Sequence, residues 1–202
     1  MEGICKIKEL SSKEYVVFDN EFNKELTPEI LELLSNYHCI VFGRNFNHPV
    51  DNLPNSIIHL RFGFSFNQPV NNLPNSLTNL EFGFSFNQSV DNLPQFLTRL
   101  KFRNNFNQPV DNLPNSLTHL QFGESSAFNQ PVDNLPNSLT YLTFGFYFNK
   151  PVDNLPNSLT YLEFGSIFDQ PIKKYPTSLK VIRVGEDYSH QLPDNIMISI
   201  AR

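Results

Sequence analysis

Two columns of polar and charged residues vary along a chain that otherwise repeats itself every 20 residues. The first column holds His59, Asn79, Arg99, His119, Tyr141 and Tyr161, and the second holds Arg61, Glu81, Lys101, Gln121, Thr143, Glu163 and Arg183. Arginine and tyrosine are favoured residues in protein–protein interfaces. Because these positions differ between copies that are nearly identical elsewhere, they predict a surface that binds a protein partner.

The charges of the second column also allow a simpler interpretation. Arg61, Glu81 and Lys101 alternate in sign on successive copies, and Glu163 is followed by Arg183. Such residues can neutralise one another across neighbouring strands. Each cross-strand pair contributes only about 0.2–1 kcal/mol, which leaves room for a partner.

A third column could hold a metal ion. It consists of Asp51, Asn71, Asp91, Asp111, Asp133 and Asp153, followed by Lys173. Stacked carboxylates resemble the ligands of calcium-binding solenoids, but calcium loops are glycine-rich and bring several oxygen atoms together. Here each Asp precedes Asn-Leu-Pro, so an Asx-type turn explains Asp and Asn equally well. We therefore expect no metal site.

The sequence gives little support for a catalytic site. His59 and His119 share a column but lie three copies apart, roughly 14 Å if the copies stack as strands, which is too far to share a metal ion. Serine and aspartate recur at the same places in every copy, whereas an active site needs one differentiated position. The chain has neither a phosphate-binding glycine loop nor a cluster of Cys and His. We expect a non-enzymatic protein without a cofactor.

The repeat itself predicts the elements that position these columns. A period of 20 residues, with one two-residue insertion at 124–127, indicates a solenoid whose small units must stack to bury their apolar faces. The alternation in Leu80-Glu81-Phe82 is typical of a short strand with one buried face, and Gly83 ends it where positive φ or close backbone approach is needed. Arg103 fills the glycine position of the next copy, so glycine is preferred there but not obligatory.

The other fixed residues of each copy have structural explanations. Two phenylalanines per copy are expected to form two stacked columns in the core, such as Phe82 and Phe86. A recurring asparagine, such as Asn87, is expected to satisfy backbone groups of coils that lack regular structure. Prolines at both ends of the return limb exclude a helix there and favour an extended or polyproline-like backbone.

The motif resembles a known family. The segment Phe62-Gly63-Phe64-Ser65-Phe66-Asn67, together with the Leu-x-x-Leu-x-Phe and Leu-Pro pattern, is similar to the FNIP (FGxxFN) repeat family over roughly residues 40–180. That family is similar to leucine-rich repeats and is known from amoebae and large DNA viruses of protists. The resemblance implies a curved solenoid with short parallel strands on its concave face, and a role in protein–protein interaction. If the chain is viral, we expect it to act as a host-directed adaptor.

The two ends depart from the repeat. Residues 1–39 are expected to form an N-terminal cap with a degenerate first copy and a short helix that begins at Thr27-Pro28, and Ile4 and Ile7 are candidate buried residues. Residues 40–181 hold the repeats, and residues 182–202 hold a degenerate last copy and a tail. The apolar tail contains Asn195, Ile196, Met197, Ile198 and Ile200. It predicts either a homodimer through a terminal strand or a simple cap, and the first option makes a self-assembling structural protein the alternative function.

The composition narrows the compartment and the partners. The net charge of −5 and the scattered basic residues argue against nucleic acid. Two cysteines are too few for a disulfide framework, and the sequence contains neither an N-terminal apolar targeting segment nor a membrane span. These observations predict an intracellular, cytoplasmic protein that does not bind membranes.

Overall fold

The fold is a single sheet of short strands stacked in chain order. A computed structural model describes residues 7–10, 13–194 and 196–201, and in this part of the chain 11 strands pair in the order of the sequence. The elements are β1 (Ile7–Leu10), β2 (Lys13–Val17), α1 (Pro28–Leu34), β3 (Cys39–Val41), β4 (His59–Arg61), β5 (Asn79–Glu81), β6 (Arg99–Phe102), β7 (His119–Phe122), β8 (Tyr141–Thr143), β9 (Tyr161–Glu163), β10 (Val181–Gly185) and β11 (Met197–Ala201).

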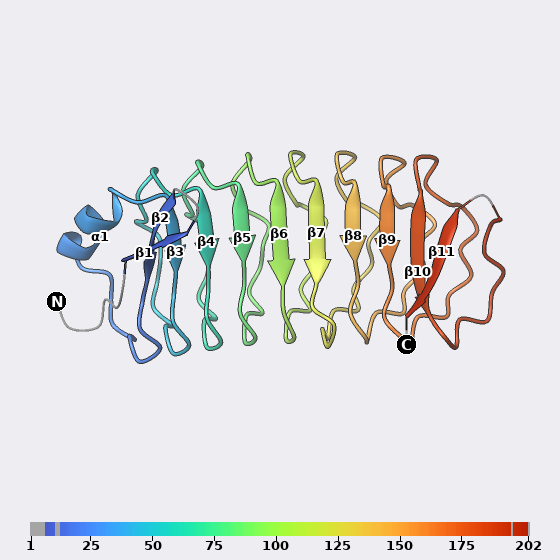
Figure 1. Cartoon of the computed structure of the whole chain (residues 1–202), viewed down its shortest axis with the longest axis horizontal. Helices are drawn as coiled ribbons and strands as arrows, with labels where there is room; N and C mark the ends of the chain where they lie inside the picture. The colour runs from blue at the N-terminus through green and yellow to red at the C-terminus, as the bar shows by residue number, and fades with distance from the viewer. Residues whose placement is uncertain (1–6, 11–12, 195, 202) are drawn as a thin grey trace.

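The stacking follows the repeat residue by residue. From β2 to β11 every pair is parallel, and equivalent residues of successive copies face each other, as Leu60 faces Leu80. Only β1 runs antiparallel to its neighbour. After β3, the described residues of the return limbs contain turns but neither helix nor strand, whereas the limb between β2 and β3 contains α1. The predicted leucine-rich-repeat-like solenoid, with strands on one side and irregular return limbs on the other, is confirmed (Figure 1).

Paired phenylalanine rings fill the core. Within one copy the two rings lie face to face, and the centroids of Phe102 and Phe106 are 3.7 Å apart. Between copies the rings are parallel but more distant, with 5.5 Å from Phe82 to Phe102 and 6.0 Å from Phe86 to Phe106. The expected two columns are confirmed, but the closest contact lies within each copy rather than along the columns.

A ladder of asparagine side chains, in the limb that follows each strand, holds successive copies together. The Oδ1 atom of each Asn accepts the backbone N–H of the equivalent residue in the next copy, as Asn107 accepts from Asn129 at 2.9 Å. The glutamine that follows donates to the same Asn, as Gln130 Nε2 does to the Asn107 carbonyl at 3.1 Å. The Asn column therefore satisfies backbone groups as predicted, and the Gln residues add a second bond that the sequence did not indicate.

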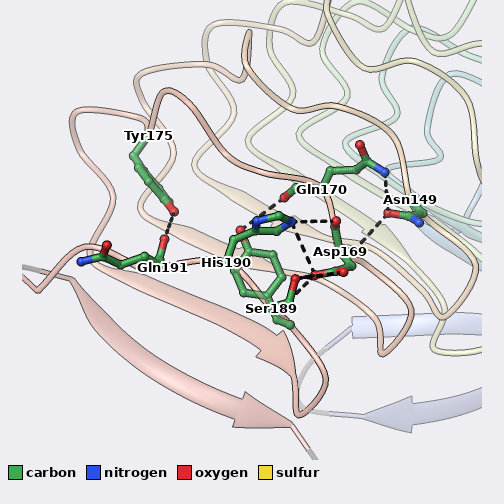
Figure 2. A network of polar contacts seen from close by, with 8 residues as sticks. Asn149, Asp169, Gln170, Tyr175, Ser189, His190 and Gln191 are labelled. Carbon is green, nitrogen blue, oxygen red and sulfur yellow. Dashed lines mark hydrogen bonds and ion pairs between the residues drawn. The ribbon is translucent and has the colours of Figure 1, made fainter.

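The last copies continue this ladder with other residue types (Figure 2). The Asp169 backbone N–H donates to Asn149 Oδ1 at 3.1 Å, and Asp169 Oδ1 accepts the Ser189 backbone N–H at 2.8 Å and the Ser189 hydroxyl at 2.9 Å. His190 Nε2 lies 3.6 Å from the same carboxylate oxygen. The hydrogen bonds from Ser189 lower the pKa of Asp169 below its ordinary value of 3.8.

This depressed pKa predicts a pH-dependent contribution to stability. A carboxylate with a lower pKa in the folded state stabilises the fold above its unfolded pKa, and the contribution is lost as the pH falls through the folded pKa. Asp169→Asn keeps the Oδ1 acceptor but does not titrate. We expect the melting temperature of the wild type to fall more steeply than that of Asp169→Asn as the pH is lowered from about 5 to below the folded pKa of Asp169. Parallel curves in circular dichroism would contradict this.

Four return limbs end in a turn whose serine, Ser76, Ser116, Ser138 or Ser158, donates to the preceding copy. The proline carbonyl accepts the N–H of the next leucine, as in Pro114 and Leu117 at 3.0 Å. The serine inside the turn donates its hydroxyl to the preceding copy, as Ser116 does to the Leu97 carbonyl at 2.7 Å. Phe96 replaces this serine in one copy and is 66% exposed. That copy therefore lacks the bond.

Phe96→Ser restores the repeat and is expected to stabilise the protein. The new hydroxyl can donate to the Leu77 carbonyl, which is worth about 0.5–1.5 kcal/mol, while little apolar burial is lost. Urea unfolding followed by circular dichroism measures the change. Phe96→Ala is the control, because it removes the same ring without adding the donor. Equal midpoints for the two variants would show that the hydroxyl contributes nothing.

The ends differ in how they are covered. The helix α1 lies at the N-terminal end of the stack as predicted, and its Leu34 is fully buried (Figure 1). Thr27 is the N-cap residue, although its side chain makes no capping hydrogen bond. At the other end the tail forms β11, which pairs with β10 of the same chain. Ile4 and Asn195 lie outside the described residues.

The insertion at 124–127 combines an exposed turn with one buried serine. Glu124 and Ser125 are exposed in a turn. Ser126, however, is completely buried, and its hydroxyl accepts the backbone N–H of Phe128 at 3.2 Å. A serine at this place satisfies the backbone where the longer copy rejoins the repeat.

Candidate functional site

The two variable columns lie side by side on the outer surface of the sheet. In each strand the central leucine is buried, while the residues before and after it point away from the core, as in Tyr161-Leu162-Glu163. We call the surface formed by these outward residues of β3–β10, together with Arg103 directly after β6, the sheet face. Its central part is hollowed by about 550 Å³, and the hollow is lined from Cys39 to Tyr141.

Arg103 changes the charge pairing that the sequence suggested. Glu81 accepts a hydrogen bond from Arg103 Nη2 at 2.7 Å and another from Arg103 Nε at 3.2 Å. Arg61 Nε approaches the other Glu81 oxygen at 3.5 Å. Glu81 is therefore held by two arginines, and Lys101, its neighbour in the column, is not one of them.

Two cations of β6 are left without a carboxylate. In the portion of the chain that the structure describes, neither Arg99 nor Lys101 forms an ion pair. His119 lies on the adjacent strand, and its Nδ1 is 2.9 Å from the Thr118 hydroxyl. Partial burial, and then the nearby positive charge of Arg99, lower the pKa of His119. The middle of the hollow is therefore positively charged even where His119 is neutral.

Beyond this cationic region the sheet face becomes aromatic. The rings of Tyr141 and Tyr161 are parallel with centroids 4.5 Å apart, and His119 stacks on Tyr141 at 5.4 Å. The Tyr161 hydroxyl donates to Glu163 Oε2 at 2.5 Å, and Arg183 lies 3.5 Å from the same oxygen. Burial, and then this hydrogen bond, raise the pKa of Tyr161. These contacts hold Tyr161, the last of the three stacked rings His119, Tyr141 and Tyr161, in one orientation.

The structure places the two predicted columns side by side on this surface, and their role in partner binding stays a prediction. Thr143 is the least accessible residue of its column, because its side chain is the shortest there and is only 8% exposed. Arg103 lies on the same surface but was not predicted to be part of it. The sequence shows Arg103 as a break in the glycine column, but only the structure shows that Arg103 forms a hydrogen-bonded ion pair with Glu81.

The aspartate column is occupied by hydrogen bonds between copies. The side chain of the following asparagine donates to the Asp of the preceding copy, as Asn112 Nδ2 does to Asp91 Oδ1 at 3.0 Å. This bond and one from Ser89 lower the pKa of Asp91. Among the described residues there is no group of three or more His, Cys, Asp or Glu side chains arranged to hold a metal ion. No helix in the described segments is long and apolar enough to cross a membrane.

The stacked coils and parallel strands define a repeat solenoid of the leucine-rich-repeat type, a fold that suggests a protein-interaction module and is typically a non-enzymatic scaffold. Within this class the chain matches the FNIP Repeat family at residues 46–85, 66–92, 86–125 and 128–167. The chain therefore belongs to the FNIP repeat family, as its motif predicted.

Known structures agree with this assignment. The chain is similar to the crystal structure described as that of CroV588, a novel circular LRR protein from a giant virus, with 40% sequence identity and a TM-score of 0.78. The similarity covers 92% of this chain but only 32% of that protein, so the chain spans about a third of its length. No curated protein matches the sequence.

Proposed function

We propose that this protein is a non-enzymatic interaction module that captures a protein partner on its sheet face and serves as an adaptor. The observation that carries the proposal is the contrast between the sheet face and the rest of each copy. Fixed residues build the core, the Asn ladder and the turns, whereas the residues that line the hollow differ from copy to copy. Differentiated residues on a repetitive scaffold are where a specific partner can be recognised.

Affinity capture with matched baits tests this proposal. One bait carries Arg99→Ala, Lys101→Ala and Tyr141→Ala on the sheet face. The control bait carries Lys24→Ala, Lys174→Ala and Phe96→Ala, which remove two cations and one aromatic ring from exposed positions outside the sheet face. We expect proteins captured by the wild type and the control bait to be lost from the sheet-face variant. Equal capture by all three baits, at equal melting temperature, would overturn the proposal.

Self-assembly through the C-terminal end is the second candidate. Ile198 and Ile200 are in register with the buried Ile182 and Val184, yet they are 43% and 61% exposed. A strand at the edge of the described sheet with exposed apolar side chains can pair with another chain. If it does, sedimentation should show a mass that rises with concentration for the wild type and a monomer for Ile198→Ser with Ile200→Ser. A wild type that remains monomeric excludes this function.

A further inference from the structure

We infer that the segment bound by the sheet face is an extended acidic peptide whose carboxylates lie on Arg99 and Lys101 and whose apolar side chain lies on the Tyr141–Tyr161 pair. The inference rests on the proposed function and adds the chemical class of the partner. It is drawn from the charge balance, the spacing and the ring stacking of this surface.

The charge of the sheet face is opposite to that of the whole chain. The chain has 15 basic and 20 acidic residues. From β3 to β10 the sheet face carries five basic side chains, Arg61, Arg99, Lys101, Arg103 and Arg183, against two acidic ones, Glu81 and Glu163. Both acidic side chains are already paired with arginine. A partner that neutralises this surface must therefore bring carboxylates of its own.

Arg103 is the reason that the positive charge is concentrated on β6. In a perfect repeat this position would be glycine, and Glu81 would remain available to Lys101 in the next copy. Arg103 donates two hydrogen bonds to Glu81 Oε1, and Arg61 lies beside Oε2, which removes that option. Arg99 and Lys101 point the same way from one strand, roughly 7 Å apart along it, and leave an unneutralised pair of cations in the hollow.

The stacking of the strands fixes the spacing that the peptide must have. Strands lie about 4.8 Å apart, so Tyr141 is two strands and Tyr161 three strands away from Arg99, roughly 10–14 Å. An extended chain advances about 3.3 Å per residue and covers this distance in roughly three or four residues. The expected motif is an acidic residue followed or preceded at that interval by an apolar or aromatic one.

Nucleic acid fits this surface less well than a peptide. Binding to a phosphate backbone draws on many cations that each release counterions, whereas here the unpaired cations of the hollow are Arg99 and Lys101. The remaining surface carries the excess of acidic residues and would repel a polyanion. Two cations beside an aromatic pair are better matched to one or two carboxylates and a neighbouring ring.

Selection from a random peptide display library tests the chemistry of the ligand directly. The full chain is used as bait, with Arg99→Glu and Lys101→Glu together as the charge-reversed variant and Lys24→Glu with Lys174→Glu as the matched control. We expect the wild type and the control to select acidic peptides with the stated interval. Binding of these peptides should weaken by about tenfold or more in the charge-reversed variant, which should itself select basic peptides.

The outcomes separate this inference from the proposed function. Neutral or basic peptides that bind the wild type and are lost with Tyr141→Ala would overturn the acidic ligand but leave the sheet face as the binding site. Acidic peptides that bind the charge-reversed variant equally well would overturn both. Competition of the selected peptides by a single-stranded oligonucleotide at lower concentration would assign the cations to nucleic acid instead and overturn the peptide inference. A library that yields no binder would count against both.

Discussion

Phe106→Ala is expected to lower the free energy of unfolding by about 3–5 kcal/mol, the range for truncating a buried aromatic side chain. Phe106 is 1% exposed, and its ring contacts rings of three successive copies, at 3.7 Å from Phe102, 6.0 Å from Phe86 and 6.0 Å from Phe128. The backbone on either side is held by the Asn ladder and cannot collapse into the cavity. The cost should therefore lie near the upper end of this range.

The measurement is urea unfolding of the full chain, followed by circular dichroism. Phe96→Ala is the matched control, because the same ring is removed from a position where 66% of the residue is exposed. It should change the free energy of unfolding by less than about 0.5 kcal/mol. In a solenoid each copy contacts only its neighbours, so Phe106→Ala should also separate the transition into two phases. A small, single-phase effect would show that the ring pairs are not the main source of cohesion.

The fold could be predicted from the sequence because each copy of the repeat presents the same pattern again. A single Leu80-Glu81-Phe82 pattern would be a weak indication of a strand, but the same pattern at every copy fixes both the strand and its register. The Asn ladder was predictable for the same reason, since only a column of amides explains why asparagine recurs at one place. Repetition replaces the information that an alignment would otherwise give.

The candidate site was less predictable because it depends on which partners the long charged side chains contact. The alternation of Arg61, Glu81 and Lys101 allowed a ladder of neutralised charges. Glu81 does pair with Arg61, but its second partner is Arg103 rather than Lys101. Arg103 reaches Glu81 from the glycine position of the next copy, and column-by-column pairing does not anticipate such a diagonal contact. Similarly, the burial of Thr143 depends on the length of its neighbours as well as on its own short side chain.

The second large effect on stability is expected in the glycine column, because glycine allows the backbones of successive copies to approach closely. A Cβ atom on Gly83 would lie 1.6 Å from the carbonyl oxygen of Gly63, and backbone atoms cannot move aside without separating the strands. On Gly123 the same atom would meet its nearest neighbour, Arg103 Cα, at 3.4 Å, an ordinary contact. The wider spacing at Gly123 occurs at the copy in which Arg103 replaces glycine. There the pairing of β6 with β7 also extends to Phe102 and Phe122.

Gly83→Ala and Gly123→Ala are therefore expected to differ strongly although they change the same residue type in equivalent copies. Gly83→Ala should destabilise the protein by about 3 kcal/mol or more, because the added methyl group overpacks a backbone contact. Gly123→Ala should be neutral or stabilise by about 0.4–1 kcal/mol, since alanine restricts the unfolded chain without a clash. Thermal and urea unfolding of the two variants measure the contrast. Equal destabilisation would mean that the column requires backbone freedom at every copy, and that Arg103 is tolerated for a reason other than the local spacing of its strands.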